Sequence, residues 1–456
     1  MTRVIVLGAG QGTRMRSPLP KVLHRVAGRP MISWVLDAVA VLRPASTVVV
    51  VGHEGDQVRD ALPAGVIAVE QSEQLGTGHA VRVGLDSLGT IDHDETLLVV
   101  YGDMPLLVGG MLGRLVDRRG EAAAVIATTR PPSPSSFGRV IRDRSGEVSA
   151  IVEEKDATPA QRAIDEVNAG VYAFRAADLV ESLAGVGTAN VKGEYYLTDT
   201  IGILIAAGKH VETVEVSHAD VIGVNDTADL ARAGHEMRLR INARLLDDGV
   251  NVIDPLRTYV DAGVTVEAGA ILYPGIHLEG ATQIGTGAVV GPDTFIVDSV
   301  IGENAHVWYS VVRGAVIEAR VEVGPYSSLR PGTKLEEGAK AGTFVEMKNA
   351  RVGKGAKVPH LSYMGDVTIG EGANVGAGSI TCNYDGVEKH ETVIGARAFI
   401  GSDTMLVAPI EIGDDAYTGA GSTITKDVEA GALAVERSEQ RSIPGYSAER
   451  ASKRRG

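Results

Sequence analysis

The first apolar segment of the chain is VIVLGAGQGTRM, residues 4–15, and LPK follows at residues 19–21. Four apolar residues before a glycine-rich turn predict a buried strand that leads into a loop. Glycines there let backbone N–H groups approach a phosphate, and Arg14 and Lys21 add positive charge on the far side of the loop. The stretch therefore predicts a site for a nucleoside triphosphate at the end of the first strand.

The spacing of these glycines differs from that of the two commoner phosphate-binding loops. A dinucleotide-binding fingerprint needs a glycine at the position of Thr13, and a Walker loop needs an ending of Gly-Lys followed by Ser or Thr. Both interpretations are therefore excluded.

Length and composition indicate several domains and a repeat. A chain of 456 residues is longer than the roughly 250 to 300 residues at which single cores stop growing, so we expect two or three domains. Glycine is abundant, with 56 residues, and aromatic residues make up only 4% of the chain. Because the glycines are regularly spaced, this bias favours a repeat whose turns need small residues.

Charge and cysteine content narrow the class of protein further. The net charge of −14 argues against a general nucleic-acid or membrane surface, although local basic pockets can still hold anionic substrates. The single cysteine, Cys382, excludes an internal disulfide framework. The start lacks the apolar region of a secretory signal, and no apolar run is long enough to span a bilayer. We therefore expect a soluble, cytoplasmic protein with no membrane or nucleic-acid partner.

Apolar runs alternate with helical patterns up to about residue 225. This alternation predicts an α/β, Rossmann-like domain with a parallel sheet covered by helices, in which ligands bind at the carboxyl ends of the strands. The expected strands are residues 4–7, 48–51, 97–100 and 124–127, and the expected helices are residues 79–88 and 112–119.

Asp103 follows the expected strand 97–100, at the edge where the glycine loop also emerges. An aspartate at that position can hold a metal ion on a triphosphate. The alternative is an aspartate that only caps a helix or forms a turn, and Asp103 taken alone does not exclude it.

A helical pattern follows, with apolar residues spaced at threes and fours among charged ones from residue 226 to about 246. We interpret it as a connecting helix whose charged face is solvated, the alternative being a partner surface. The expected organisation is a first domain at residues 1–226, a helical linker at 227–247, and a second domain with a carboxyl-terminal tail at 248–456.

The period of the sequence changes to six beyond about residue 250. The hexads that mark this period begin with Ile or Val followed by Gly, and a small residue usually stands at their fifth place. Three hexads form one triangular coil, and stacked coils bury the apolar first residues, so the pattern predicts a left-handed parallel β-helix. Its open flanks and triangular section favour a homotrimer. The hexads begin at Ile284, Ile301, Val323, Val352, Ile369, Val375, Ile394, Ile400 and Ile412.

With both halves interpreted, the chain resembles a family of bacterial bifunctional enzymes. These enzymes join a glucosamine-1-phosphate acetyltransferase to an N-acetylglucosamine-1-phosphate uridylyltransferase and make UDP-N-acetylglucosamine. The resemblance extends over nearly the whole length and in the same order. The matching stretches are residues 7–21, 71–80, 101–103, 137–139, 151–153, 167–170, 223–226, 329–332, 345–348, 360–366, 382–386 and 401–403.

The resemblance implies a uridylyltransferase site in the first domain. It implies that uracil lies near Gln71, Gly76 and Thr77, and the sugar near Gly138, Glu153 and Asn168. Asp103 and Asn225 would hold Mg²⁺, and Arg14 and Lys21 would balance charge on UTP, the alternative being surface cations. The remaining implied substrate contacts are Leu7, Gly8, Ala9, Gly10, Tyr101 and Gly102.

The resemblance also implies an acetyltransferase site in the β-helix. His360 would take the proton from the 2-amino group of the sugar, although a lone histidine on a β-coil is more often a hydrogen-bonded surface residue. The implied sugar phosphate contacts are Arg330, Lys348, Tyr363, Asn374 and Lys389. The implied acetyl-CoA contacts are Ala377, Asn383, Tyr384, Ser402, Ala420 and Arg437.

Residues 382–392 interrupt the hexads and should protrude as a loop that reaches a neighbouring coil, which makes an active site between subunits an expectation. Nothing marks Cys382 as an activated nucleophile, so we expect a neutral thiol. Two features depart from the family pattern, Pro359 directly before His360 and the segment 436–440 around Arg437.

The resemblance implies two successive reactions that supply peptidoglycan and other cell-envelope precursors, with Mg²⁺ as cofactor and acetyl-CoA and UTP as co-substrates. One alternative is a single nucleotidylyltransferase whose β-helix only assembles or regulates. The set His360, Tyr363, Asn374 and Lys389 argues against it. A second alternative is a non-enzymatic scaffold, against which Arg14, Lys21, Asp103 and Asn225 argue.

Overall fold

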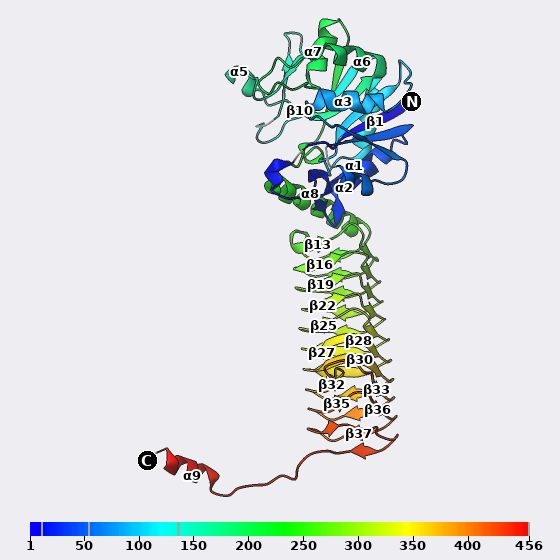
Figure 1. Ribbon diagram of the computed structural model, residues 1–456, viewed down its shortest axis with the longest axis vertical. Helices are drawn as coiled ribbons and strands as arrows, with labels where there is room; N and C mark the ends of the chain where they lie inside the picture. Colours follow the sequence, from blue (N-terminus) through cyan, green and yellow to red (C-terminus); the bar gives the residue numbers. More distant parts are fainter. Residues whose placement is uncertain (11, 53–54, 135–136, 455–456) are drawn as a thin grey trace. The chain divides into compact units, whose positions relative to one another are not determined.

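The computed structural model describes residues 1–10, 12–52, 55–134 and 137–454, so Gln11 of the glycine loop lies outside the described residues. The chain forms two compact units, Met1–Leu239 and Arg240–Gly456. Figure 1 labels the main elements of both units.

A mixed sheet forms the centre of the first unit, with strand order β11-β7-β10-β6-β1-β4-β5. The four predicted strands are present as β1, β4, β6 and β7. β1 pairs in parallel with β4 and β6, as expected, but β10 runs antiparallel to both β6 and β7. The strands are β1 (Thr2–Leu7), β4 (Ser46–Val51), β5 (Val66–Glu70), β6 (Thr96–Tyr101), β7 (Ala124–Thr129), β10 (Val167–Arg175) and β11 (Val211–Glu215).

The direction of β10 has a local cause. Between β7 and β10 the chain makes an antiparallel pair, β8 (Arg139–Arg142) with β9 (Val148–Val152). Among the described residues between β7 and β10, the one helix is α5 (Pro159–Arg162), a single turn with Thr158 as its N-cap, and it is too short to act as a crossover helix. The chain therefore re-enters the sheet at the edge where β7 ended, which reverses the next strand. A short hairpin, β2 (Arg25–Val26) with β3 (Arg29–Pro30), lies apart from this sheet.

Helices cover both faces of the sheet. Alternate residues of β1 enter different cores, with Val4 and Val6 in one and Ile5 and Leu7 in the other. α1 (Met31–Ala40) and α4 (Gly109–Arg119) supply the first core, and α3 (Thr77–Asp86), α6 (Ala176–Gly185) and α7 (Asp199–Ala206) supply the second. α3 and α4 correspond to the two predicted helices, and α2 (Asp56–Asp60) is a short further helix.

α8 (Thr227–Asp247) occupies the predicted linker, and the division between the two compact units falls inside it. It starts where the Asp226 carboxylate accepts the N–H groups of Ala228 at 3.0 Å and Asp229 at 2.9 Å. Near its end the buried Asn242 donates to the carbonyls of Pro255 at 2.7 Å and Thr258 at 2.9 Å. The functional boundaries at residues 226 and 248 stay a prediction.

The second unit is a parallel β-helix, drawn as successive coils in Figure 1. Each strand pairs in parallel with the strand one coil further on, so Ile271 pairs with Val289 and Val289 with His306. One sheet contains β12 (Asn251–Val252), β15 (Ile271–Leu272), β18 (Val289–Val290), β21 (His306–Val307), β24 (Glu322–Val323), β27 (Lys340–Thr343), β29 (Lys357–His360), β31 (Asn374–Val375), β34 (Phe399–Ile400), β37 (Tyr417–Thr418) and β39 (Leu433–Ala434).

The other faces of the coils form one continuous sheet. Its strands are β13 (Thr258–Val260), β14 (Thr265–Val266), β16 (Ile276–Glu279), β17 (Gln283–Ile284), β19 (Phe295–Val297), β20 (Val300–Ile301), β22 (Val311–Arg313), β23 (Val316–Ile317), β25 (Ser328–Leu329), β26 (Lys334–Leu335), β28 (Glu346–Val352), β30 (Tyr363–Ile369), β32 (Ile380–Cys382), β33 (Thr392–Ile394), β35 (Met405–Val407), β36 (Ile410–Ile412) and β38 (Thr423–Ile424).

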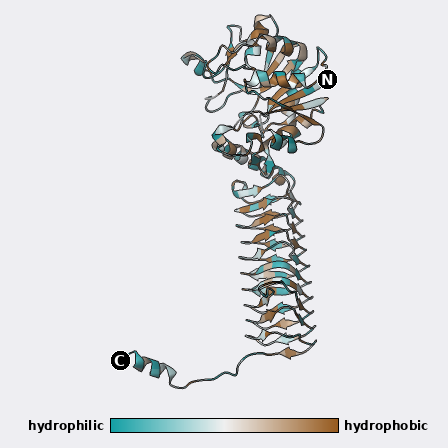
Figure 2. Ribbon diagram, viewed as in Figure 1, coloured by the Kyte–Doolittle hydropathy of each residue, from teal (hydrophilic) through white to brown (hydrophobic). Residues whose placement is uncertain are grey.

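The hexad prediction is confirmed residue by residue. All nine predicted first residues lie in the core of the β-helix and are almost fully buried. The glycines that follow allow close approach of coils: a Cβ on Gly370 would lie 2.4 Å from the backbone nitrogen of Ala396. Figure 2 shows the hydrophobic residues concentrated on strands, whereas α9 (Tyr446–Lys453) is mainly hydrophilic. Among the described residues, no helix has the length and apolar character needed to cross a membrane.

Candidate functional sites

A cavity of about 410 Å³ lies at the carboxyl ends of β1 and β6 in the first unit. Residues that are far apart in sequence meet there, because both strands deliver their following loops to one edge of the sheet. The lining includes the predicted Leu7, Gly8, Ala9, Gly10, Lys21, Gln71, Gly76, Thr77, Tyr101, Asp103, Gly138, Glu153, Asn168 and Asn225.

Two predicted residues do not line this cavity. The backbone N–H of Gly102 donates to the carbonyl of Leu7 at 2.9 Å and so fixes β6 beside β1. Arg14 is exposed in η1 (Thr13–Met15), outside the lining. Its charge contributes to the lowered pKa of Asp226, of which the main cause is the backbone hydrogen bond from Asp229.

The glycine loop brings a cation and a carboxylate together. Lys21, at the start of η2 (Lys21–Leu23), makes an ion pair with Asp103, and both side chains are mostly buried. Gly12 has φ of 59°, and a Cβ there would lie 2.9 Å from the Cβ of Lys21. A side chain at position 12 would therefore displace the lysine from the loop.

The residues present fit a magnesium ion bound with a nucleotide. Asp103 offers a carboxylate and Asn225 an amide oxygen, and the backbone N–H of Val224 donates to the Asp103 carbonyl at 2.9 Å. Within the described part of the chain, no group of three or more His, Cys, Asp or Glu side chains is placed to hold a metal. Mg²⁺ commonly takes only one or two protein oxygens and completes its shell with phosphates and water.

In the region predicted for uracil, glutamine side chains form hydrogen bonds that hold the segment after β5 in place. Gln71 follows β5, is 3% exposed, and places Nε2 at 3.1 Å from the Gly76 carbonyl and 3.0 Å from Nδ1 of His79. Gln74 donates from Nε2 to the carbonyl of Ala9 at 2.6 Å, which fastens this segment to the glycine loop.

The region predicted for the sugar contains a carboxyl in an apolar setting. Burial raises the pKa of Glu153, although Thr198 donates to its Oε1 at 3.1 Å. Asn168 donates from Nδ2 to the hydroxyl of Tyr172 at 2.6 Å, and its backbone N–H donates to the Gly138 carbonyl at 2.8 Å. Asn168 on β10 is thus held beside Gly138, which directly precedes β8.

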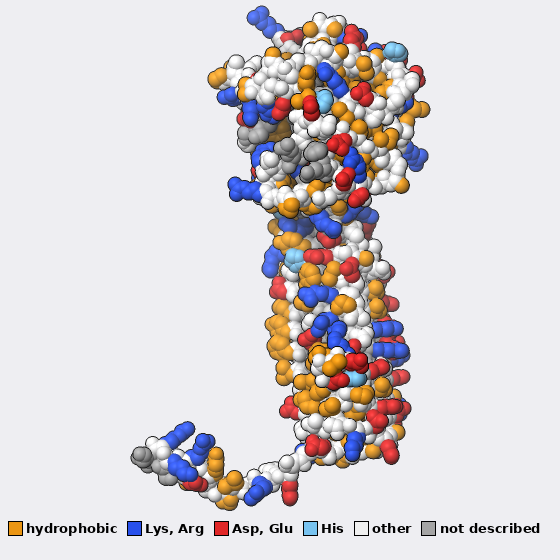
Figure 3. Space-filling view, viewed as in Figure 1, with side chains coloured by type: hydrophobic (Ala, Val, Ile, Leu, Met, Phe, Trp, Pro, Cys, Tyr) orange, Lys and Arg blue, Asp and Glu red, His pale blue; other side chains and the backbone are white. Residues whose placement is uncertain are grey.

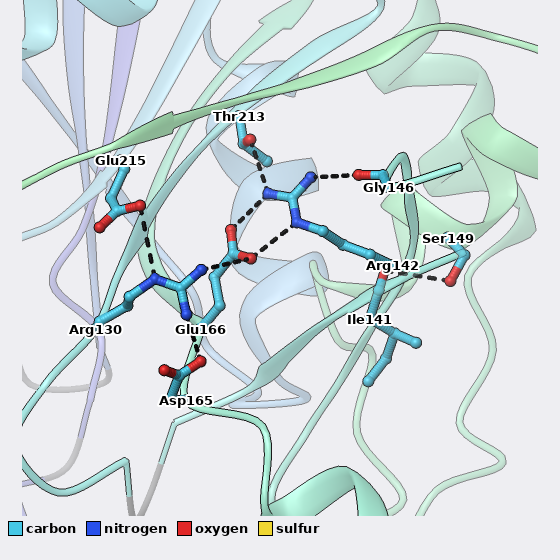
Figure 4. Close-up of polar contacts among 9 residues, drawn as sticks. All are labelled: Arg130, Ile141, Arg142, Gly146, Ser149, Asp165, Glu166, Thr213 and Glu215. Atoms are coloured by element: carbon cyan, nitrogen blue, oxygen red, sulfur yellow. Dashed lines mark hydrogen bonds and ion pairs between the residues drawn. The ribbon is translucent and has the colours of Figure 1, made fainter. Parts of the chain in front are cut away.

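A charged network forms around Glu166, two residues before Asn168 in the chain (Figure 4). Glu166 precedes β10 and its side chain is 7% exposed. Arg142 donates to it twice, from Nε to Oε2 at 2.8 Å and from Nη2 to Oε1 at 2.6 Å. Arg130 lies 3.6 Å from the same carboxylate and also pairs with Asp165. Arg142 further donates to Thr213 at 3.1 Å, so the network joins β8, β10 and β11.

In the second unit, most residues predicted for acetyl-CoA lie in one ladder that begins at His360. The Gly378 N–H approaches the His360 carbonyl at 3.4 Å, and the Asp403 N–H donates to the Ala377 carbonyl at 2.7 Å. The Gly421 N–H donates to the carbonyl of Ser402 at 2.8 Å. Arg437 donates from Nη1 to the carbonyl of Ala420 at 2.8 Å. These links stack the predicted residues on successive coils at the same corner.

A cationic cluster lies on the sheet that follows this corner. Lys348 pairs in register with Gly365, and the nearby Lys389 ammonium lowers the pKa of Lys348. Arg330 is close to Lys348 and donates to Glu346 at 3.0 Å. Tyr363 follows the corner in β30, and a Cβ on Gly365 would lie 2.5 Å from its hydroxyl. Figure 3 shows basic and acidic side chains interspersed along the coils.

Besides Glu346, which pairs with Arg330, the carboxylate of Asp366 balances the charge of this cluster. Partial burial opposes its ionisation, but hydrogen bonds from Asn349 and Asn383 lower the pKa of Asp366. Asn349 donates at 2.9 Å and Asn383 at 2.5 Å. Asp366 therefore connects the cationic cluster to Asn383, a residue predicted for acetyl-CoA.

The predicted loop is present after Cys382, and Tyr384 is 59% exposed in it. Its shape is fixed by Asp385, whose Oδ2 lies 2.7 Å from Nε2 of His390 and whose Oδ1 accepts two backbone N–H groups. Burial raises the pKa of the Cys382 thiol, in agreement with the expected neutral group.

Asn374 is the predicted residue that a single chain does not bring to the cluster. It pairs in register with Lys357 and Phe399, whereas His360 ends β29 three positions after Lys357. Asn374 therefore lies beside the start of β29, whereas the corner that carries His360 lies at the end of β29.

Several lining residues were not predicted individually. Glu194, Met104 and Val221 line the first cavity. Glu194 comes from a loop without a motif, so the sequence carries no signal for it. Gln74 and Asp366 stand inside stretches quoted for the resemblance, and a polar side chain within a matched stretch is the signal that would have found them.

Comparison with known proteins agrees with both halves. The family described as MobA-like NTP transferase domain matches residues 4–167, and the family described as bacterial transferase hexapeptide (six repeats) matches residues 391–426. The second match agrees with the predicted left-handed β-helix, and with the first it confirms the predicted fold class.

Full-length relatives cover nearly the whole chain. A protein named bifunctional protein GlmU from Streptomyces avermitilis is 48% identical, over 98% of this chain and 94% of the relative. Proteins of the same name from Kineococcus radiotolerans and Heliobacterium modesticaldum are both 47% identical, over 97% and 96% of this chain and 91% and 96% of the relatives. The chain belongs to the GlmU family of bifunctional proteins, which confirms the resemblance predicted from the sequence.

Proposed function

We propose that the cavity of the first unit is the uridylyltransferase site of this bifunctional enzyme and that the corner at His360 belongs to its acetyltransferase site. The enzyme transfers an acetyl group from acetyl-CoA to glucosamine-1-phosphate, and then a uridylyl group from UTP to the product. The products are UDP-N-acetylglucosamine and pyrophosphate, for peptidoglycan and other cell-envelope precursors. The enzyme works in the cytoplasm, because UTP and acetyl-CoA are made there.

One observation carries the first assignment. Fourteen residues inferred from the sequence, spread from Leu7 to Asn225, line one cavity together. The residues come from the ends of β1 and β6, from several loops, from β10 and from the starts of η2 and α3, so their convergence on one cavity supports the assignment.

Uridylyl transfer at this site needs no protein nucleophile. A phosphate oxygen of the sugar phosphate attacks the α-phosphorus of UTP, and the bond to pyrophosphate breaks. Lys21 and the backbone N–H groups of the glycine loop bind phosphate oxygens, and Arg14 approaches the leaving group from the loop. Asp103 and Asn225 would hold Mg²⁺, which when bound neutralises phosphate charge.

Acetyl transfer is direct. The 2-amino nitrogen of the sugar attacks the thioester carbonyl carbon of acetyl-CoA, and the bond to the CoA sulfur breaks. His360 accepts the proton that the amine loses. Arg330, Lys348 and Lys389 bind the sugar phosphate, and the ladder from Ala377 to Arg437 binds acetyl-CoA.

A product assay resolved by mass tests both assignments. The enzyme is supplied with glucosamine-1-phosphate, acetyl-CoA, UTP and Mg²⁺. His360→Ala should form UDP-N-acetylglucosamine only when N-acetylglucosamine-1-phosphate is supplied, whereas Asp103→Ala should accumulate that acetylated intermediate. Acetylation that survives in His360→Ala would overturn the role of His360, and uridylylation that survives in Asp103→Ala would overturn that of Asp103.

We also propose a homotrimer in which Asn374 of one copy completes the acetyltransferase site of another. Support comes from the position of Asn374 at the far end of the strand row from His360. Co-expression of Lys348→Ala and Asn374→Ala chains should restore acetyl transfer at about a quarter of the sites in randomly mixed trimers. Mixtures no more active than the separate variants would show that the site forms within one chain.

A further inference from the structure

The geometry points to His79 as a positioning residue that sets the nucleobase specificity of uridylyl transfer, by fixing which end of the Gln71 amide faces the base. The inference deepens the proposed function, since it rests on the assignment of Gln71 to uracil. It starts from the hydrogen bonds of the Gln71 side chain, which is 3% exposed and lines the cavity.

Both hydrogens of the Gln71 amide are used inside the protein. Nε2 donates to the Gly76 carbonyl at 3.1 Å and lies 3.0 Å from Nδ1 of His79. A carbonyl oxygen only accepts, so the nitrogen end of the amide must face Gly76. Because Nε2 only donates, Nδ1 of His79 must accept, which assigns the neutral histidine with its proton on Nε2.

The acceptor at Gly76 cannot move away. A Cβ on Gly76 would lie 2.6 Å from the carbonyl oxygen of Tyr195, so the backbone of Gly76 is packed against the segment that contains Tyr195. The Tyr195 N–H donates to the Leu75 carbonyl at 2.8 Å, and the Gly78 N–H donates to the Tyr195 carbonyl at 2.7 Å. Gly76 also accepts the first helical bond of α3, from Ala80 at 3.1 Å. The turn that carries both acceptors is therefore rigid.

The consequence is a fixed polarity toward the ligand. With both amide hydrogens engaged, Oε1 of Gln71 is the end of the amide left for a ligand, and no partner for it occurs among the described residues. Oε1 can accept a hydrogen bond from N3–H of uracil. Cytosine has no hydrogen at N3 and would place an acceptor against an acceptor. A flipped amide would remove this discrimination, but it would set two oxygens against each other at Gly76.

His79 contributes the part of this lock that mutation can test cleanly. It lies in the first turn of α3, and its side chain is only partly buried. In His79→Leu, a branch of similar shape replaces Nδ1 but cannot accept. In His79→Asn, the amide oxygen stands near the position of Nδ1 and can accept. Comparison of the two variants therefore distinguishes the effect of the lost hydrogen bond from the effect of altered packing.

The experiment measures kcat/KM for UTP and for CTP in the full-length enzyme with N-acetylglucosamine-1-phosphate. We expect His79→Leu to lower the preference for UTP over CTP about tenfold, the value of one lost hydrogen bond. His79→Asn should restore most of that preference. KM for the sugar phosphate and the rate of acetyl transfer should stay unchanged in both variants. Asp86→Asn, an exposed change on α3, is the matched control.

The possible outcomes distinguish an error in the role of His79 from an error in the assignment of Gln71 to uracil. An unchanged preference in His79→Leu would overturn the role of His79, as would an equal loss in His79→Leu and His79→Asn, since packing alone would then explain it. Gln71→Ala tests the underlying assignment: if it keeps the full preference for UTP, then uracil is not read by Gln71 and the proposed placement of the base is wrong.

Discussion

Replacing Glu166 by glutamine should loosen the sugar region of the uridylyltransferase site without touching a substrate. Glu166 accepts two short hydrogen bonds from Arg142, at 2.6 and 2.8 Å, and its side chain is 7% exposed. A glutamine keeps one acceptor oxygen but turns an NH₂ group toward the guanidinium. One charge-assisted hydrogen bond and the ionic attraction are lost, which costs roughly 2 kcal/mol because Arg142 is partly exposed and water can take its freed N–H.

The loss should appear where the network meets the cavity. The Val140 N–H donates to the Glu166 carbonyl at 3.1 Å, and the Asn168 N–H donates to the Gly138 carbonyl at 2.8 Å. Hydrogen exchange of these two amides should accelerate about 30-fold, the equivalent of about 2 kcal/mol in local opening. KM for N-acetylglucosamine-1-phosphate should rise more than KM for UTP, and acetyl transfer in the other unit should not change.

The pH dependence of this effect has a definite direction. The hydrogen bonds from Arg142 lower the pKa of Glu166 in the folded protein. Its stabilisation is therefore present above the pKa of an unfolded glutamate and is lost as pH falls through the lowered folded value. The difference between wild type and Glu166→Gln should shrink in acid. Glu212→Gln is the control, because Glu212 on β11 forms an ion pair with the exposed Arg118 of α4. Unchanged exchange at Val140 and Asn168 near neutral pH would refute the reasoning.

Three further changes separate the two units. Lys21→Met should lower kcat/KM for uridylyl transfer at least 100-fold, because a buried cation no longer meets the triphosphate, while acetyl transfer measured by thiol release persists. Asp385→Asn should lower acetyl transfer several-fold, because hydrogen bonding from His390 holds the pKa of Asp385 low and the pair shapes the loop; an unchanged rate of thiol release would contradict this. Ile369→Ala should lower the free energy of unfolding of the β-helix by about 2–5 kcal/mol, measured by urea unfolding with a probe that reports on this unit alone. A smaller change would mean that the coils collapse into the cavity left by the removed side chain.

The β-helix could be predicted almost completely because its code is local. One buried residue per hexad, in many hexads followed by glycine, determines which side chain points inward, and stacking repeats the pattern without long-range information. The direction of β10 could not be predicted in this way. It depends on the pairing of β8 with β9, and that pairing contains a register shift between Ile141 and Arg142.

The first site was predictable to the extent that strand ends determine it. Gln71 directly follows β5 and Asp103 lies two residues after the end of β6, so their convergence at one sheet edge follows from topology. The supporting contacts were not predictable. Glu166 and Arg142 are 24 positions apart, and only the fold shows that their charges meet. The same holds for the orientation of the Gln71 amide, which depends on a carbonyl held by Tyr195.

The two sites differ in how far one chain completes them, and the difference follows from architecture. A twisted sheet gathers many loops at one edge, so residues from Leu7 to Asn225 of a single chain line the cavity of the first unit. A β-helix presents each side chain in a straight row along its axis, and rows on different faces never converge. His360 and Asn374 lie on neighbouring strands of one sheet but in different rows, at opposite ends of their strands, so the proposed site that uses both takes its second residue from a neighbouring prism. In the proposed homotrimer, association would therefore serve the chemistry of the acetyltransferase site in addition to any stability that it provides.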